Sequence, residues 1–251
     1  MSKKSWEDKE VSQIYVKSID PNSANEINLT KKLYHDPFFF SLLPDLTNKR
    51  ILDIGCGDGY MLNKLSFICK NCNLVGMDLP NMLEETAIEK DAIELIPADC
   101  HELPFENNSF DLVISSLMFH WVVDLSTIAK EMFRILKPGG TFVTSSINPN
   151  TFHVGYWENL DTDKPKYVLT KDITKERQFE VYLNKTVGPL TYYMRPIERY
   201  KQIFEQVGFN KVKTEEPLLK DDKVLGKYPE LTKYSFYPLY LFTTGIKKTQ
   251  D

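Results

Sequence analysis

The stretch RILDIGCGDGYML, residues 50–62, joins a short apolar run to three closely spaced glycines. Residues 51–54 consist of apolar side chains and one aspartate, a composition typical of a buried strand in a parallel sheet. Gly55, Gly57 and Gly59 follow at once, and a helical pattern comes after them. Because glycine has no Cβ, such a turn bends sharply and admits a ligand close to the backbone. The stretch therefore predicts a strand, a ligand-approaching turn and a helix.

The alternation of apolar strands and amphipathic helices continues along the chain. The predicted strands cover residues 51–54, 73–77, 93–96, 110–114 and 141–144, and the predicted helices cover 60–68, 82–89 and 125–136. Strands that alternate with helices imply βαβ units with right-handed crossovers, and hence a parallel sheet. Two closing strands are predicted at 211–214 and 236–246, as a hairpin at the sheet edge. The expected fold class is α/β: a Rossmann-like doubly wound sheet, mostly parallel, with an antiparallel edge hairpin and a lid insertion.

Changes in composition divide the chain into four predicted parts. They are an N-terminal helical preface (1–49), a ligand-binding core (50–147), a lid or acceptor-binding insertion (148–195), and a closing helix with edge strands (196–251). The insertion is rich in Asn, Asp, Lys, Tyr and Trp, and we expect it to be irregular or helical. Within the last part, 197–207 predicts a helix, and the charged residues between the two closing strands predict a surface loop.

Composition and charge narrow the class of partner. The chain has 251 residues, is 42% hydrophobic and 26% charged, and carries a formal net charge of −4, so a large core is expected and general attraction to nucleic acid or anionic lipid is not. Residues 1–10 lack the apolar core of a signal peptide, and no stretch approaches the roughly 18 apolar residues of a membrane helix. We therefore expect a cytoplasmic protein that acts on a small molecule, with neither nucleic acid nor membrane as partner.

The four cysteines fit a reducing compartment, and one pair raises a question. Cys69 and Cys72 have C-x-x-C spacing, which occurs in redox and zinc sites. No second pair completes a zinc tetrahedron, and this pair ends a predicted helix, where the helix dipole disfavours a thiolate. A structural role is therefore favoured, and we predict no metal site.

Acidic residues end the two strands that follow the glycine turn. Asp78 comes 19 residues after Gly59 and is placed to bind both hydroxyls of a ribose, or alternatively to cap the next helix. Asp99 ends the third strand, where its carboxylate would accept a hydrogen bond from an adenine amino group. The spacing G-x-G-x-G differs from the G-x-G-x-x-G of dinucleotide folds. Together the turn and the two acids predict a site for an adenosine-containing ligand.

Residues 50–147, with this turn and these acids, resemble the class I S-adenosylmethionine-dependent methyltransferases. The resemblance is to the small-molecule branch that includes the ubiquinone and menaquinone methyltransferases. The resemblance is carried by LDIGCGDG (52–59), VGMDLPNML (75–83), ADCHELPFENNSFDLV (98–113) and FRILKPGGTFV (133–143). It extends more weakly to 191–209. It implies S-adenosyl-L-methionine as the cofactor and methyl transfer as the activity.

Carried over residue by residue, the resemblance implies a cofactor site. Asp53 and Gly55 would orient the amino and carboxylate groups of the methionine part, beside Cys56 and Gly57 of the turn. Asp78 would take the ribose, while Leu79 and Met82 pack on the adenine. The expected remaining contacts are Asp99 and the Cys100 amide at the adenine edge, His101 in the cofactor wall, the Ser115 carbonyl at the methionine amine, and Tyr15 closing over the cofactor.

The acceptor side is predicted from the end of the fourth strand and from the insertion. His120 lies just after that strand and is the candidate general base, or alternatively an orienting group. The expected acceptor-binding residues are Phe119, Trp121, His153, Tyr156 and Tyr192. The segment SSLMFHW (115–121) lacks the signature of amino-base methyltransferases, which argues against a nucleobase amine as acceptor. The predicted function is methyl transfer to a small organic acceptor by in-line displacement.

Two other functions stay open at this level. An NAD-dependent oxidoreductase would share the strand–glycine–helix pattern, although the glycine spacing and Asp99 argue against it. A non-catalytic binding module would keep the fold, although the intact glycines and acids argue against that too. Titration with NAD and with S-adenosylmethionine distinguishes an oxidoreductase from a methyltransferase. A methyl-transfer assay distinguishes a non-catalytic binding module from a methyltransferase.

Overall fold

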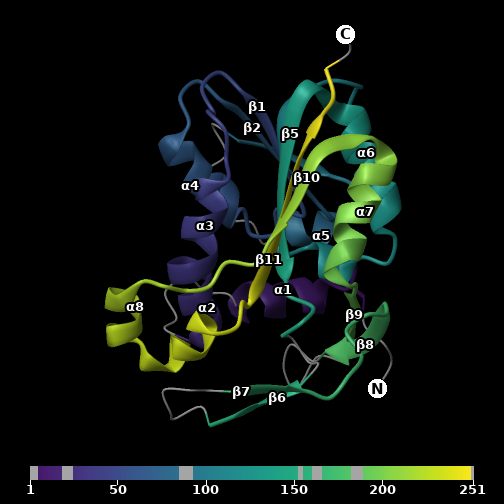
Figure 1. Ribbon diagram of the computed structural model, residues 1–251. Coiled ribbons are helices and arrows are strands. Elements are labelled where there is room, and N and C mark those ends of the chain that lie inside the picture. The colour runs from purple at the N-terminus through teal and green to yellow at the C-terminus, as the bar shows by residue number, and fades with distance from the viewer. Residues whose placement is uncertain are drawn as a thin grey trace.

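The computed structural model describes residues 5–18, 25–84, 93–151, 155–159, 166–181 and 189–249. At its centre is a seven-stranded sheet with the order β10-β11-β5-β4-β1-β2-β3 (Figure 1). The strands are β1 (Arg50–Ile54), β2 (Asn73–Asp78), β3 (Ile93–Pro97), β4 (Phe110–Ser116), β5 (Leu136–Ile147), β10 (Phe209–Glu215) and β11 (Tyr240–Lys247).

Strand direction follows the expected pattern. β1 is parallel to both β2 and β4, with Asp53 opposite Gly76 on one side and Ile114 on the other. β3 and β5 extend the parallel sheet, whereas β11 runs antiparallel to β5 and to β10. The predicted fold class, a mostly parallel sheet with an antiparallel edge, is thus confirmed. The strand order reverses between β1 and β4, and in open α/β sheets ligands bind at the carboxyl ends of the strands beside such a reversal.

Helices cover both faces of the sheet (Figure 1). α3 (Asp36–Ser41) and α4 (Tyr60–Ile68) lie on one face, and α6 (Leu125–Ile135) and α7 (Ile197–Val207) lie on the other. Alternate residues of β1 supply the two cores: Ile51 packs with the α3–α4 side, and Leu52 packs with the α6–α7 side. Because β1 is buried on both faces, its sequence is an apolar run rather than an alternation.

The N-terminal part is helical, as expected, and contains a π-helical turn. It comprises α1 (Lys9–Ser18), α2 (Glu26–Thr30), the π-helix η1 (Lys31–His35) and α3. Figure 1 shows α1 crossing beneath the carboxyl end of the sheet. His35 is fully buried, with Nδ1 2.9 Å from Asp36 Oδ1 and Nε2 2.8 Å from Ser145 Oγ, so it fixes this helix to β5.

The prediction for 148–195 was wrong in its secondary structure. The described residues there form two hairpins, β6 (Gly155–Glu158) with β7 (Lys166–Leu169), and β8 (Arg177–Val181) with β9 (Leu190–Met194). Both hairpins lie beyond the carboxyl end of the sheet (Figure 1). The strands are only four or five residues long, too short for their alternation to stand out among polar neighbours.

Other boundaries differ in smaller ways. The helix expected at 82–89 is described only as α5 (Pro80–Leu83), and 85–92 lie outside the described residues. The loop expected between the closing strands contains α8 (Asp222–Lys227) and the 3-10 helix η4 (Pro229–Ser235), which packs Leu231 and Tyr234 into the α3–α4 core. Among the described residues, no helix is both long enough and apolar enough to cross a membrane.

Candidate functional site

The turn after β1 is built around left-handed backbone conformations. Gly55, Gly57 and Gly59 have φ values of 72°, 56° and 79°. The amides of Gly55 and Cys56 donate to the carbonyl of Met77 at 2.8 and 3.1 Å, which anchors the turn to β2. Since residues with a Cβ rarely adopt positive φ, the glycine spacing is what allows the chain to turn here and enter α4.

Two of these glycines serve different purposes. A Cβ added at Gly55 would lie 2.5 Å from Met118 Cγ, so this glycine lets the chain after β4 pack against the turn. At Gly57 the nearest atom to an added Cβ is Met82 Cε, at 4.0 Å. Gly57 therefore faces open space, which belongs to a cavity of about 630 Å³.

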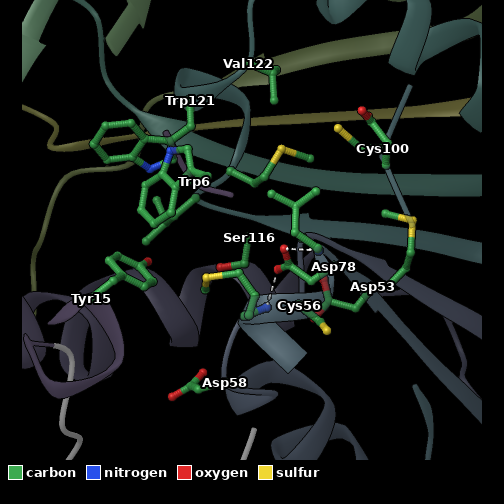
Figure 2. A pocket seen from close by; sticks show the side chains of 18 of the residues that line it. Trp6, Tyr15, Asp53, Cys56, Asp58, Asp78, Cys100, Ser116, Trp121 and Val122 are labelled. Atoms are coloured by element: carbon green, nitrogen blue, oxygen red, sulfur yellow. Dashed lines mark hydrogen bonds between the residues drawn. The ribbon is translucent and has the colours of Figure 1, made fainter. Parts of the chain in front are cut away.

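This cavity lies at the carboxyl ends of β1, β2 and β4, where the strand order reverses. Its volume is within the range of cavities that hold small molecules and cofactors. The predicted cofactor residues that line it are Tyr15, Asp53, Gly55, Cys56, Gly57, Asp78, Leu79, Met82, Asp99, Cys100 and His101. Figure 2 shows Asp53 and Asp78 in its middle, Cys100 at one side, and Trp6 and Trp121 at the other.

Asp78 is tied to the glycine turn. Its Oδ2 accepts a hydrogen bond from the Gly57 amide and its Oδ1 accepts one from the Leu79 amide, both at 2.7 Å. Burial raises the pKa of the Asp78 carboxyl despite these two bonds. The residue before α5 is Leu79, which makes no side-chain cap, so Asp78 is not the N-cap of that helix. Asp78 thus shapes the turn from the neighbouring strand and keeps free lone pairs toward the cavity.

Asp53 is the least satisfied acid of the site. Its side chain is buried, with 1% exposed, and Oδ1 has no hydrogen-bond partner among the described residues. Burial raises its pKa well above the usual value, the negative charge of Asp78 raises it further, and Lys31 opposes both. A buried carboxylate without a partner is unfavourable, so this site is complete only when a cationic or hydrogen-bonding group meets Asp53.

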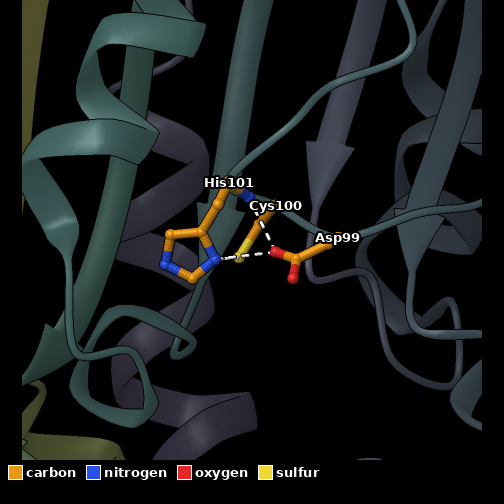
Figure 3. A group of neighbouring side chains, drawn as sticks. All are labelled: Asp99, Cys100 and His101. Atoms are coloured by element: carbon orange, nitrogen blue, oxygen red, sulfur yellow. Dashed lines mark hydrogen bonds and ion pairs between the residues drawn. The ribbon is translucent and has the colours of Figure 1, made fainter.

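Asp99, Cys100 and His101 form a tight turn (Figure 3). This turn lines the side of the cavity that lies opposite Trp6 and Trp121. Asp99 Oδ1 lies 2.8 Å from the His101 amide nitrogen and 2.7 Å from His101 Nδ1. Burial acts to raise the pKa of Asp99, but the bonds and charge of His101 outweigh it and lower the pKa. Burial and the neighbouring Asp99 raise the pKa of the Cys100 thiol to about 12, so the sulfur stays protonated. The bonds within this turn account for its geometry.

Comparison with known proteins places this geometry in a family. Residues 52–144 match the family described as Methyltransferase domain. The chain is 31% identical over 172 residues to the demethylmenaquinone methyltransferase of Staphylococcus haemolyticus, a match that covers 65% of this chain and 70% of that protein. The crystal structure of an S-adenosylmethionine-dependent methyltransferase from Mesorhizobium loti matches with a TM-score of 0.72 and 25% identity, over 84% of this chain and 96% of that chain. The chain belongs to the class I S-adenosylmethionine-dependent methyltransferases.

Several other relatives are matched over a smaller part of the chain. The malonyl-[acyl-carrier protein] O-methyltransferase of Legionella pneumophila is 32% identical over 108 residues, 41% of this chain and 38% of that protein. The chain spans less than half the length of several such curated relatives, among them a human mitochondrial protein named arginine-hydroxylase NDUFAF5. Family membership confirms the resemblance inferred from the motifs. The relatives act on different acceptors, so membership does not identify the acceptor of this chain.

Lys31 is a cavity residue that sequence reasoning missed. Its ammonium lies 4.0 Å from the centroid of the Tyr60 ring. Burial lowers its pKa, while the charges of Asp58, Asp36 and Asp53 act in the opposite direction. Lys31 begins the π-helical turn, and a π turn shifts the face on which a helix presents its side chains. The apolar period of this segment therefore gave no signal that a lysine would face the cavity.

The resemblance assigns the Ser115 carbonyl to the methionine amine, and this role stays a prediction, because the structure describes only where the Ser115 side chain packs. The Ser115 side chain is fully buried, and its Oγ donates to the Ile54 carbonyl at 2.8 Å. Ser116, the last residue of β4, lines the cavity instead, and its Oγ has no partner among the described residues. Successive strand side chains point to opposite faces, so Ser116 faces the cavity while the Ser115 side chain packs in the core.

Of the predicted acceptor residues within the described ranges, Trp121 alone lines the cavity. Phe119 packs in the α6–α7 core, Tyr192 is buried beside His120, and Tyr156 is exposed on β6. His153 lies outside the described residues.

His120 supports the cavity wall from behind. Its ring stacks on Tyr192 with centroids 4.8 Å apart, and Nδ1 lies 3.1 Å from Ser146 Oγ. Burial lowers its pKa to about 3, with the charge of Arg195 adding to the effect. The ring does not line the cavity, so this geometry gives no support to the predicted role as general base.

A group of aromatic and β9 residues makes up the other side of the cavity. We call it the aromatic half: Trp6, Tyr15, Trp121, Leu190, Thr191 and Tyr193. The Trp6 ring meets Trp121 edge-on at 5.0 Å and Tyr15 at 5.1 Å between centroids. Leu190 packs with Val11 of α1, which joins the N-terminal part to β9. Tyr15 and Trp121 of this group are predicted from the sequence as site residues, whereas Trp6, Leu190 and Thr191 are brought in by packing between distant segments.

Arg195, which follows β9, joins that strand to the chain after β4. It is almost fully buried and donates to the carbonyls of Phe119, Val122 and Val123 at 3.1, 2.6 and 2.8 Å. Val122 and Val123 also line the cavity. Hydrogen bonds from a charged donor are among the stronger ones in proteins, so Arg195 fixes the position of the chain that carries Trp121.

The C-x-x-C pair lies away from the cavity. Cys69 and Cys72 are both free thiols, and Cys72 Sγ donates to the Leu46 carbonyl at 3.0 Å. Burial and the neighbouring Cys72 raise the pKa of Cys69 to about 12. A raised thiol pKa suits packing rather than thiolate chemistry, as the structural interpretation of the pair expects.

Proposed function

We propose that the chain binds S-adenosylmethionine in this cavity and transfers its methyl group to a small organic acceptor. The observation that carries the proposal is Asp53, a buried carboxylate whose Oδ1 has no partner among the described residues, beside Gly57, which leaves the cavity open at the turn. An ammonium group is the natural partner for such a carboxylate. Membership of the methyltransferase family supports the same assignment.

The cavity offers a complementary group for each part of this cofactor. Asp53 takes the ammonium and Lys31 the carboxylate of the amino-acid part, which explains why a lysine is buried among acids here. Asp78 takes the ribose, and Asp99 takes the amino group of the adenine, against the apolar side chain of Met82. When bound, S-adenosylmethionine supplies a methyl group already activated by a positive sulfur.

The residues of this chain then provide position and exclusion of water. Because the donor is activated, holding the acceptor in line is the main requirement. The described part of the insertion supplies β9, whose Leu190, Thr191 and Tyr193 face the cavity together with α1 and Trp6. We propose that these segments act as the lid over the core, the domain division expected from the sequence. His120 serves in this proposal as a support for Trp121, since its pKa and its position both disfavour proton transfer.

The proposal also covers compartment and partners. Four free cysteines and a net charge of −4 support a reducing, cytoplasmic setting and a small-molecule acceptor rather than a nucleic acid.

Calorimetry with S-adenosylhomocysteine tests the cofactor assignment directly. The protein should bind it, Asp53→Asn should weaken binding, and Asp45→Asn, at an exposed loop outside the cavity, should not. Incubation with methyl-labelled S-adenosylmethionine and a small-molecule extract should then move label into the small-molecule fraction. Binding of NAD instead would support the oxidoreductase, and binding without transfer would support the non-catalytic module.

A further inference from the structure

Five residues that line the cavity carry a buried polar atom with no hydrogen-bond partner among the described residues. They are Asp53 Oδ1, His101 Nε2, Ser116 Oγ, Thr191 Oγ1 and Trp6 Nε1. Asp53 and His101 belong to the cofactor end of the site. The other three come from β4, β9 and the N-terminal segment, and the cofactor assignment uses none of them. Buried polar groups are normally paired, so three orphans around one cavity indicate a second polar ligand.

The surroundings of these three atoms are fixed. The Trp6 ring is held between Trp121 and Tyr15, and the Trp6 carbonyl accepts a 2.7 Å hydrogen bond from Asn81 Nδ2. Thr191 lies within the β8–β9 ladder, opposite Glu180. Figure 2 shows Ser116 between the indole rings and the acids, at the border of the aromatic half. The Trp6 ring and the Thr191 backbone are therefore held in place before a ligand binds.

The chemistry of this half is apolar and uncharged. None of its six residues bears a charge near neutral pH, and Glu7, which also lines the cavity, is exposed. Arg195, a buried cation behind this half, already donates to three carbonyls, and Lys31, a cation that lines the cavity, lies among the acids of the cofactor end. An anionic ligand group would find no cation here, whereas an uncharged oxygen would find an indole N–H and two hydroxyls. The edge-to-face rings offer flat apolar surface beside these donors.

We propose that the aromatic half binds a flat, largely apolar acceptor whose uncharged oxygen accepts hydrogen bonds from Trp6 Nε1 and from the hydroxyls of Thr191 and Ser116. The proposal rests on the proposed function only in calling this ligand the methyl acceptor. The binding chemistry follows from the cavity by itself.

Three probes of similar size separate the possibilities: 1-tetralone, with an uncharged carbonyl, tetralin, with no oxygen, and 2-naphthoate, an anion. Each is titrated by calorimetry into the protein with and without saturating S-adenosylhomocysteine. Tetralone should bind more tightly than either of the others. Thr191→Val should weaken the binding of tetralone about 3- to 10-fold, the usual effect of losing one neutral hydrogen bond. The same substitution should leave the affinity for tetralin unchanged. Thr214→Val, in edge strand β10 and outside the cavity, is the matched control.

A direct readout comes from the indole N–H signals of nitrogen-15-labelled tryptophan. Tetralone should shift the signal of Trp6 downfield, tetralin should not, and Trp6→Phe should remove that signal. Naphthoate binding as tightly as tetralone, or no response of Trp6 and no effect of Thr191→Val, would overturn the proposal. Failure to bind S-adenosylhomocysteine would refute the proposed function instead, and the titrations without it would still decide the chemistry of the aromatic half.

Discussion

The cofactor half and the aromatic half of the cavity differ in how the chain assembles them. In the cofactor half, Gly57 follows β1, Asp78 ends β2 and Asp99 follows β3, so each residue is placed by a strand end of the parallel sheet. In the aromatic half, Trp6 and Trp121 meet β9 across long stretches of sequence. One half is positioned by the backbone topology, and the other depends on side chains that pack between separate segments.

The difference also appears in the packing beneath each half. The strands that carry the cofactor half lie between two large cores that together span most of the sheet. The aromatic half rests on a small cluster whose fully buried members are Val11 and Leu190. We therefore expect substitutions in the cofactor half to affect binding with little loss of stability, and substitutions behind the aromatic half to affect stability and acceptor binding together.

The largest effect is expected at the glycine turn. Gly57→Val places a branched side chain in the open space at the turn and forces a β-branched residue into a left-handed conformation. S-adenosylhomocysteine affinity should fall by more than about 100-fold, since both the contact and the turn are lost. Calorimetry measures the binding, and far-ultraviolet circular dichroism measures the fold.

Gly226→Val is the matched control, because an added Cβ at Gly226 of α8 meets nothing within 4 Å. Its binding should equal that of the wild type. If Gly57→Val retains affinity within threefold while folded, the turn does not face the cofactor, and the assignment of the cofactor half is wrong.

The same contrast explains what the sequence allowed us to predict. Strand β1, the glycine turn and Asp78 were predicted because a single local pattern, an apolar run followed by glycines or an acid, places them at a strand end. Helix α7 was predicted from its 3.6-residue period. Lys31 was missed because a π turn changes the face of its helix, a feature that the apolar period does not reveal.

The aromatic half was predicted in part only. Trp121 was found because it follows β4, whereas Thr191 gave no signal, since nothing local ties a short strand of the insertion to the carboxyl end of the sheet. His120 was chosen for its position along the chain, but its ring turns toward Tyr192 and Ser146 instead of the cavity. Which way a side chain points after a strand end depends on tertiary packing.

The second largest effect is expected at Arg195. Arg195→Met leaves the carbonyls of Phe119, Val122 and Val123 without their charged donor, and should lower the free energy of unfolding by about 3 kcal/mol. Urea denaturation measures this loss. Arg199→Met removes an exposed ion pair with Glu176 and should cost less than about 1 kcal/mol.

Binding separates the two halves in the same variant. Arg195→Met should weaken the binding of 1-tetralone at least about tenfold, because the chain that carries Trp121 loses its support. The affinity of the variant for S-adenosylhomocysteine should stay within about threefold of the wild-type value. Equal losses for both ligands would show that the halves are not independent.

A smaller effect is expected at Asp53, and it depends on pH. Burial raises the pKa of Asp53 in the free protein, whereas a bound ammonium favours the charged carboxylate and lowers that pKa. Affinity for S-adenosylhomocysteine should therefore rise with pH through this pKa, and binding should release protons. Calorimetry in buffers of different ionisation enthalpy measures that release. Asp53→Asn should bind about 10- to 100-fold more weakly at high pH and lose the pH dependence. An unchanged pH profile in the variant would rule out Asp53 as the group that titrates.

The smallest effect at neutral pH is expected at His120, which lies behind the aromatic half. Burial and the charge of Arg195 lower its pKa to about 3, so the folded state holds a neutral ring while the unfolded state protonates near pH 6.5. Stability is therefore lost as the pH falls below 6.5, by up to about 1.4 kcal/mol for each pH unit until the folded pKa is reached. His120→Gln keeps a hydrogen-bonding group for Ser146 but has no proton to gain, so urea midpoints at pH 7.5 and pH 5.5 should differ less in the variant than in the wild type.

At pH 7.5 the variant should bind S-adenosylhomocysteine and 1-tetralone within about twofold of the wild type, since the ring does not line the cavity. Once an acceptor is identified, loss of methyl transfer in a folded His120→Gln variant that still binds both ligands would return His120 to the role of base.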